Sequence, residues 1–179
     1  KDAEVHETLA WWANCLGITG SPFDSFLTLR GLRTLDARLR VHQENTHALV
    51  ELLDAHPAVR VVHYPGLPCH PGHALAARQQ SGFGAMLSVE LEHGGLDAEA
   101  AVRVFLEGLE YFTLAESLGG VESLVAHAAT MTHAAMSPEA RAEAGIGDGL
   151  LRLSVGIEHV DDLVADITAA LGRVYAVTS

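Results

Sequence analysis

The residue of this chain best placed to bind a charged ligand is an arginine at position 152. It lies in residues 150–158, whose side chains alternate in polarity like those of a half-buried strand. Arg152 falls on the face opposite to the apolar set, Leu151, Leu153 and Val155. Because a guanidinium can grip a carboxylate through two parallel hydrogen bonds, we expect Arg152 to hold the α-carboxylate of an amino-acid substrate. A solvated arginine on the open face of a sheet would give the same pattern.

A second candidate is the stretch of residues 115–124, which follows an expected short strand and contains two adjacent glycines. Paired glycines let a backbone come close to a ligand, and such loops often form site walls. Ser117 would offer hydroxyl and backbone contacts to a carboxylate, and Glu116 would meet an ammonium group. An ordinary turn between a strand and a helix is the alternative interpretation.

The histidines and cysteines do not predict a metal site. The chain has eleven histidines and two cysteines, and the only close cluster is Cys69, His70 and His73 in a turn rich in proline and glycine. A zinc site needs three or four ligands, and no second pair lies at finger-like spacing. We interpret His127 and His133 as hydrogen-bonded structural residues. The sequence also lacks a Gly-x-Ser-x-Gly elbow, a Walker A motif and a dinucleotide-binding glycine loop.

Composition narrows the range of partners. The formal net charge of -12 argues against binding to nucleic acid or to anionic membranes. No apolar run approaches the length of a membrane span. Two cysteines are too few for a disulfide framework, and nothing resembles a signal peptide, so we expect a cytoplasmic protein without nucleic-acid or membrane partners.

The elements expected to position these residues alternate between helices and strands. Ser21 and Pro22 form a typical helix start, with serine as N-cap and proline at the first helical position. Residues 115–136 read as irregular, and Trp11–Trp12 read as a buried helix face or a partly interfacial one. We expect helices at residues 4–15, 22–31, 32–56, 73–80, 97–108, 138–145 and 160–174, and strands at 59–64, 86–92, 111–114 and 150–158.

This order fits an α/β or α+β sheet covered by helices on one face. In the long helix, the apolar residues are spaced by threes and fours and predict one buried stripe: Leu32, Leu35, Leu39, Leu49 and Leu53. The same helix is the best candidate for a boundary between two domains.

Several motifs resemble one known family. Residues 112–124 (Phe-Thr-Leu-Ala-Glu-Ser-Leu-Gly-Gly-Val-Glu-Ser-Leu), 131–134 (Met-Thr-His-Ala) and 151–158 (Leu-Arg-Leu-Ser-Val-Gly-Ile-Glu) resemble C-terminal signatures of the Cys/Met-metabolism family of pyridoxal-phosphate enzymes, and residues 25–35 and 78–84 match as well. The resemblance implies the aminotransferase-like fold of type I. It places the end of the large cofactor-binding domain and the connecting helix at residues 1–40. Residues 41–179 would form the small C-terminal domain, an antiparallel sheet covered by helices.

The resemblance also implies an activity and a cofactor. Residues 9–14 (Leu-Ala-Trp-Trp-Ala-Asn) and 17–20 (Gly-Ile-Thr-Gly) are most similar to members that catalyse a γ-replacement with pyridoxal 5'-phosphate. In that reaction O-succinyl-L-homoserine exchanges its acyl group for the sulfur of L-cysteine, giving L-cystathionine. A γ-lyase that cleaves cystathionine, and a binding module that kept the fold without the chemistry, stay as alternatives. The resemblance also implies a homotetramer, built from dimers whose subunits share active sites.

Four residues of this chain match substrate-binding positions of the family. Arg152 matches the α-carboxylate arginine, and Ser117 matches a serine near that carboxylate and the catalytic lysine. Glu116 occupies a position linked to the choice between γ- and β-chemistry, and Asn14 matches an asparagine that reaches a neighbouring subunit's substrate site.

The catalytic side of the site is expected upstream of this chain. Lys1 is the only lysine, and the Asp-Ala-Glu that follows it does not fit the motif of the family's Schiff-base lysine. We therefore assign no catalytic or cofactor-binding residue here. We expect the chain to be about the last half of the enzyme, and to be inactive alone.

Overall fold

The computed structural model describes residues 2–18 and 20–178, and its backbone contacts divide the chain into two compact units, residues 1–37 and 38–179. The first unit consists of helices α1 (Ala3–Leu16) and α2 (Pro22–Leu32). The Asp2 carboxylate accepts hydrogen bonds from the amides of Glu4 and Val5 and caps α1. As predicted, Ser21 caps α2, accepting from the Asp24 amide at 3.1 Å.

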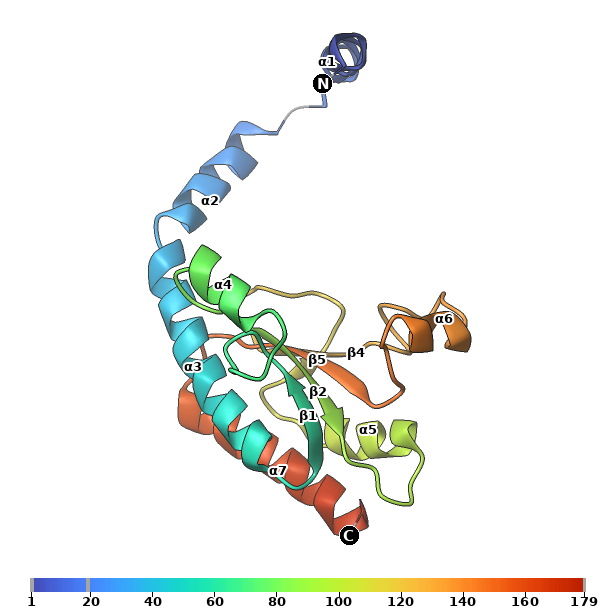
Figure 1. Ribbon diagram of the computed structural model, residues 1–179. Coiled ribbons are helices and arrows are strands. Elements are labelled where there is room, and N and C mark those ends of the chain that lie inside the picture. Colours follow the sequence, from blue (N-terminus) through green and yellow to red (C-terminus); the bar gives the residue numbers. More distant parts are fainter. Residues whose placement is uncertain (1, 19, 179) are drawn as a thin grey trace. The chain divides into compact units, whose positions relative to one another are not determined.

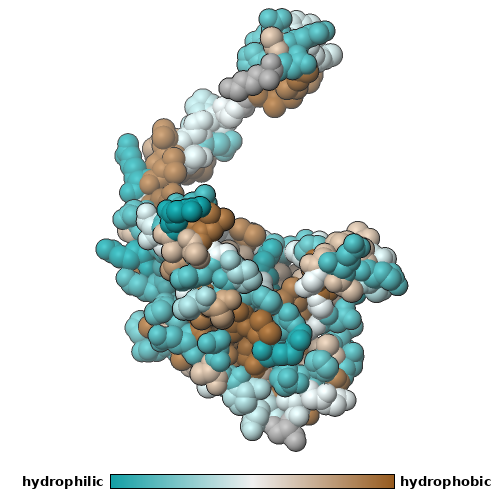
Figure 2. Space-filling model, viewed as in Figure 1, coloured by the Kyte–Doolittle hydropathy of each residue, from teal (hydrophilic) through white to brown (hydrophobic). Residues whose placement is uncertain are grey.

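Neither helix of the first unit has a buried residue. Trp11 and Trp12 are 58% and 50% exposed, with their rings edge to face at 4.7 Å, so the prediction of a buried helix face is wrong within this chain. Hydrophobic side chains are visible on the surface of both helices (Figure 2), and the other exposed ones are Val5, Leu9, Leu16, Phe23, Phe26, Leu27, Leu29 and Leu32.

The second unit is built on a five-stranded sheet of order β1-β2-β5-β4-β3 (Figure 1). The strands are β1 (Val59–His63), β2 (Met86–Leu91), β3 (Thr113–Leu114), β4 (Leu124–His127) and β5 (Leu150–Ser154). The first four in spatial order pair antiparallel, but β3 pairs parallel to β4. The sheet is therefore mixed, and the expectation of a purely antiparallel sheet is corrected at this edge.

Three helices supply the hydrophobic core of this unit: α3 (Leu35–Ala55), α5 (Ala98–Leu106) and α7 (Val160–Thr178). Leu87, Val89 and Leu91 of β2 are buried, as the alternation predicted, and contact the same core. Helices α4 (His73–Gln79) and α6 (Pro138–Glu143) bury no residue. The largest fully buried core side chains are Phe105, Leu49, Leu53, Leu91, Leu151, Leu153, Leu163, Ile167, Leu171, Val89, Val125 and Val155.

Strand β4 was not predicted, because it falls within residues 115–136, which read as irregular. All four of its residues are buried, so it has no alternation of polar and apolar side chains to mark it. It lies between β3 and β5 in the sheet, and its strand conformation depends on these two neighbours.

Helix α3 begins later than predicted, and its buried stripe is different. Leu35 and Leu39 are exposed, whereas Leu49 and Leu53 are completely buried. Three polar residues continue the buried stripe towards the start of the helix: His42, Asn45 and Thr46. None of the described helices is long and apolar enough to cross a bilayer.

Candidate functional site

The site residues of the second unit gather around strand β5. Leu151 and Leu153 are fully buried in the core, and the alternation of the strand places Arg152 on the opposite face of the sheet. The register pairs Arg152 with Ser88 of β2 on one side and with Ala126 of β4 on the other. The arginine therefore lies on a central strand, where its backbone is fixed from both sides.

The guanidinium of Arg152 is oriented by the loop between β3 and β4. Its Nη2 donates to the backbone carbonyls of Glu116 at 2.8 Å and of Ser117 at 3.1 Å. Its Nε is buried and has no hydrogen-bond partner among the described residues. A buried N–H group without an acceptor costs about 1–3 kcal/mol, and the two Nη2 hydrogen bonds fix the direction of the guanidinium.

The loop of residues 115–123 is anchored to the end of β5. The Gly119 amide donates to Ser154 Oγ at 2.8 Å, and the Ile157 amide donates to the Val121 carbonyl at 2.9 Å. Gly119 has a φ of +75°, a conformation that favours glycine. The loop therefore turns close over the strand that carries the arginine.

The structure brings together three of the four predicted site residues. The side chains of Glu116 and Ser117 are exposed, and their carbonyls contact Arg152. Asn14 lies in α1, which belongs to the first unit. Its role at a substrate site stays a prediction.

A buried hydrogen-bond network next to the site was missed from sequence. The Glu158 carboxylate accepts from the Ser123 amide at 2.6 Å and from its hydroxyl at 2.8 Å, and Ser123 Oγ accepts from the Gly156 amide at 2.8 Å. Asn45 of α3 donates to the carbonyls of Gly156 at 3.1 Å and Glu158 at 2.9 Å. The sequence did contain a signal for Asn45, because polar residues of α3 occupy positions that continue the spacing of its apolar residues.

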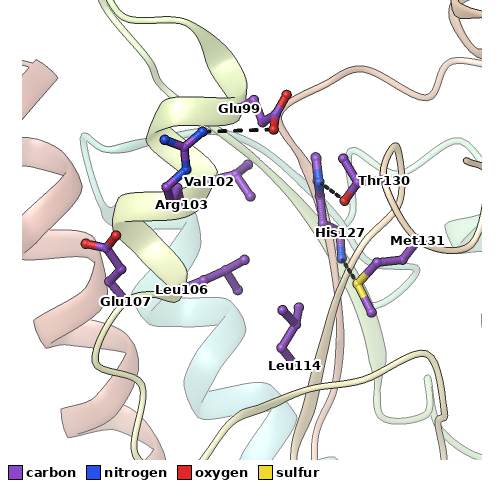
Figure 3. Close-up of a pocket in the computed structure, with 9 residues that line it drawn as sticks. All are labelled: Glu99, Val102, Arg103, Leu106, Glu107, Leu114, His127, Thr130 and Met131. Atoms are coloured by element: carbon purple, nitrogen blue, oxygen red, sulfur yellow. Dashed lines mark hydrogen bonds and ion pairs between the residues drawn. The ribbon is translucent and has the colours of Figure 1, made fainter.

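A cavity of about 340 Å³ lies elsewhere on the second unit, between α5, β3 and the end of β4 (Figure 3). Val102, Leu106 and Leu114 form much of its wall, and none of the predicted site residues lines it. His127, at its edge, lies 2.8 Å from the Asp148 carbonyl through Nε2 and 2.8 Å from Thr130 Oγ1 through Nδ1. A carbonyl only accepts, so Nε2 carries the proton, and His127 is a hydrogen-bonded structural residue.

The side chains of the cluster Cys69, His70 and His73 make separate contacts. Across residues 2–18 and 20–178, no three His, Cys, Asp or Glu side chains lie close enough together to hold a metal ion. His73 instead hydrogen-bonds the Pro65 carbonyl and stacks on Phe83, and Cys69 is exposed.

Comparison with known proteins identifies the family of the chain. The family model for "Cys/Met metabolism PLP-dependent enzyme" matches residues 1–172. Cystathionine gamma-synthase of Escherichia coli K12 is 58% identical over 167 residues, which are 93% of this chain and 42% of that protein. Cystathionine gamma-lyase of Dictyostelium discoideum is 49% identical over 170 residues, which are 95% of this chain and 43% of that protein.

A solved structure shows the same fold. Cystathionine gamma-synthase from Xanthomonas oryzae pv. oryzae in complex with cystathionine is 71% identical, with a TM-score of 0.87 over 98% of this chain and 44% of the other. The chain thus spans less than half the length of the relatives that it matches.

Proposed function

Because the chain belongs to the Cys/Met metabolism family of pyridoxal-phosphate-dependent enzymes, we propose that it forms the substrate-carboxylate side of an enzyme that makes L-cystathionine. The substrates are O-succinyl-L-homoserine and L-cysteine, and the reaction replaces the succinyl group by the cysteine sulfur. The observation that carries the proposal is the guanidinium of Arg152, fixed by two loop carbonyls while its buried Nε still lacks an acceptor.

The residues of this chain fit an amino-acid carboxylate. Arg152 supplies donors in a planar fork, the Ser117 hydroxyl lies on the loop that contacts it, and the exposed Glu116 carboxylate would meet a positive group of the substrate. These contacts would orient the amino acid and hold its carboxylate away from the reacting γ-carbon.

Pyridoxal 5'-phosphate is the cofactor of the family and supplies an electron sink when it is bound. The described residues include no lysine, and Lys1 lies outside them. The residues present therefore fit the substrate end of the site, and we propose that the groups holding the cofactor belong to the part of the protein that this chain does not cover.

Similarity supports the synthase over the lyases. The synthase relatives reach 58% identity in sequence and 71% among solved structures. Lyase relatives reach 50% in sequence, and the cystathionine gamma-lyase structure from Micromonospora echinospora reaches 42%. Cystathionine cleavage by a γ-lyase is the second candidate, because the same family and fold contain both activities. Assembly into a homotetramer and a cytoplasmic location belong to the same proposal.

Product analysis on the complete protein tests this function. The protein is incubated with O-succinyl-L-homoserine and L-cysteine, and separately with L-cystathionine, and the products are identified by mass spectrometry. Cystathionine in the first reaction is the expected result. Release of cysteine and 2-oxobutyrate only in the second reaction would instead assign a γ-lyase. No product in either reaction would favour the binding module without catalysis.

A further inference from the structure

The loop that orients Arg152 has few contacts with the hydrophobic core. From Glu116 to Glu122 every residue is exposed except Gly120, which is half-buried. Packing therefore contributes little to its position, and hydrogen bonds must fix it. The loop's carbonyls at Glu116 and Ser117 are the acceptors that orient the guanidinium, so any shift of the loop also moves Arg152.

The C-terminal end of this loop is held by Glu158. Ser123 is completely buried, and its amide and hydroxyl both donate to the Glu158 carboxylate, at 2.6 and 2.8 Å. Hydrogen bonds to an ionised acceptor are shorter and stronger than neutral ones. The Ser123 carbonyl accepts from the Thr113 amide at 3.0 Å, which closes the base of the loop. Glu158 thus fixes the residue where both ends of the loop meet.

Glu158 is itself held rigidly. Its backbone carbonyl accepts from Asn45, a buried residue of α3, at 2.9 Å. Gly156, two residues before it, packs so closely that a β-carbon there would collide with the Val121 carbonyl and the Glu158 carboxylate. The carboxylate therefore connects a fixed turn after β5 to an exposed loop before β4.

We propose that Glu158 is a positioning residue for substrate binding: through Ser123 it sets the loop carbonyls that orient the Arg152 guanidinium towards an α-carboxylate. The inference rests on the proposed role of Arg152 and adds to it a residue that contacts neither substrate nor cofactor. Its specific consequence is that loss of the Glu158 carboxylate weakens binding of the substrate carboxylate.

The direction in which KM changes distinguishes a positioning role of Glu158 from a purely electrostatic one. Glu158→Gln removes a negative charge from the surroundings of a carboxylate-binding site, so charge alone would lower KM for the amino acid. If Glu158 positions the loop, KM rises instead. The amide keeps the size of the side chain but places N–H groups against Ser123 Oγ, whose own hydrogen then has no acceptor.

The test is a double-mutant cycle in the complete protein, with the amino-acid substrate that it converts. We expect Glu158→Gln to raise KM about tenfold with kcat changed less than threefold. In the Arg152→Ala background the same substitution should change KM less than twofold, because there is no guanidinium left to orient. Glu122→Gln is the matched control, since that exposed carboxylate has no hydrogen-bond partner within the described residues; it should leave both constants unchanged.

Three results would overturn the inference. The first is an unchanged or lower KM in Glu158→Gln, and the second is a full tenfold effect that persists in Arg152→Ala, as a general structural role would give. The third is an unchanged KM in Arg152→Ala alone, which would also reject the proposed role of the arginine, whereas the first two leave that role intact. If Glu158→Gln does not fold, Ser123→Ala replaces it in the same cycle; it removes the hydroxyl that donates to Glu158 and accepts from the Gly156 amide, and it keeps the Ser123 backbone amide that donates to Glu158.

Discussion

The hydrogen bonds of Arg152 determine what a substitution at this position should do. A guanidinium has five N–H donors, and in this structure the backbone carbonyls of Glu116 and Ser117 occupy Nη2 only. Nε is buried and has no acceptor. A substrate carboxylate that bound to it would form a charge-assisted hydrogen bond, and it would also remove the free-energy cost of leaving this N–H group unpaired.

We predict that Arg152→Ala lowers kcat/KM of the complete protein by about 3 kcal/mol, on the order of a hundredfold, mostly through KM. Arg152→Lys should recover only a small part, because an ammonium cannot form the planar fork. Steady-state kinetics with the converted amino acid measures both. Kinetics within twofold of the unmodified protein in Arg152→Ala would reject the carboxylate role.

Glu116 is predicted to affect substrate choice rather than stability. Its side chain is exposed and makes no hydrogen bond or ion pair with another described residue, so Glu116→Ala removes no interaction within this chain. We expect the melting temperature to change by less than about 2 °C, as for ordinary surface substitutions, while the ratio of replacement to elimination products changes. A large fall in melting temperature with an unchanged product ratio would identify a structural glutamate.

At this scale the sequence predicted the local geometry of the strand but not the contacts between distant residues. The alternation around Arg152 correctly placed it opposite Leu151 and Leu153, because strand periodicity is a local property. The Glu158–Ser123 pair spans 35 residues, and only the packing of the turn against the loop brings the two side chains together. No spacing rule in the sequence specifies such a contact.

At the scale of elements, Asp166 of α7 fixes the approach to the site loop. Its carboxylate is 7% exposed and accepts from three consecutive amides, those of Glu110, Tyr111 and Phe112, at 2.9–3.1 Å. These residues lead directly into β3, from which the loop over Arg152 begins. One carboxylate therefore connects a core helix to the edge strand.

We predict that Asp166→Ala destabilises this segment by about 3 kcal/mol, because it leaves three backbone donors without their acceptor, one of them buried. Local opening would then be roughly a hundredfold more frequent. Hydrogen–deuterium exchange of a peptide covering residues 109–115 measures it. Asp161→Ala is the control, since that side chain on the same helix is 87% exposed; equal exchange in both variants would contradict the role of Asp166.

The elements that the sequence predicted share a local signal, and those it missed depend on tertiary contacts. Strand β2 alternates strictly and was predicted within one residue of its end. Strand β4 is buried on both faces and only four residues long, so it has neither period nor length to distinguish it from a loop. In α3 the leucine spacing correctly predicted a helix with an apolar stripe. Spacing alone does not show which leucines of that stripe are buried against other residues of the same chain.

At the scale of the whole molecule, the first unit exposes more apolar surface than a stable monomer usually does. Trp11, Trp12, Phe23 and Phe26 are each at least half exposed, and no residue of α1 or α2 is buried. Exposed patches of this kind mark interaction surfaces. The relatives are more than twice as long as this chain, so we infer that another part of the complete protein, or a second copy, covers these helices.

This inference predicts the effect of a charge on α1. Trp12→Glu in the complete protein should weaken assembly, because a carboxylate in an apolar interface loses its hydration without gaining a partner. Sedimentation velocity should show a smaller species at low micromolar concentration. Glu7→Gln, on the same helix and also exposed, should sediment as the unmodified protein does. If Trp12→Glu also keeps the native sedimentation coefficient and melting temperature, the Trp12 ring is exposed to solvent in the complete protein. That result would also weaken the prediction that Asn14, two residues further along the helix, lies at a neighbouring subunit's site.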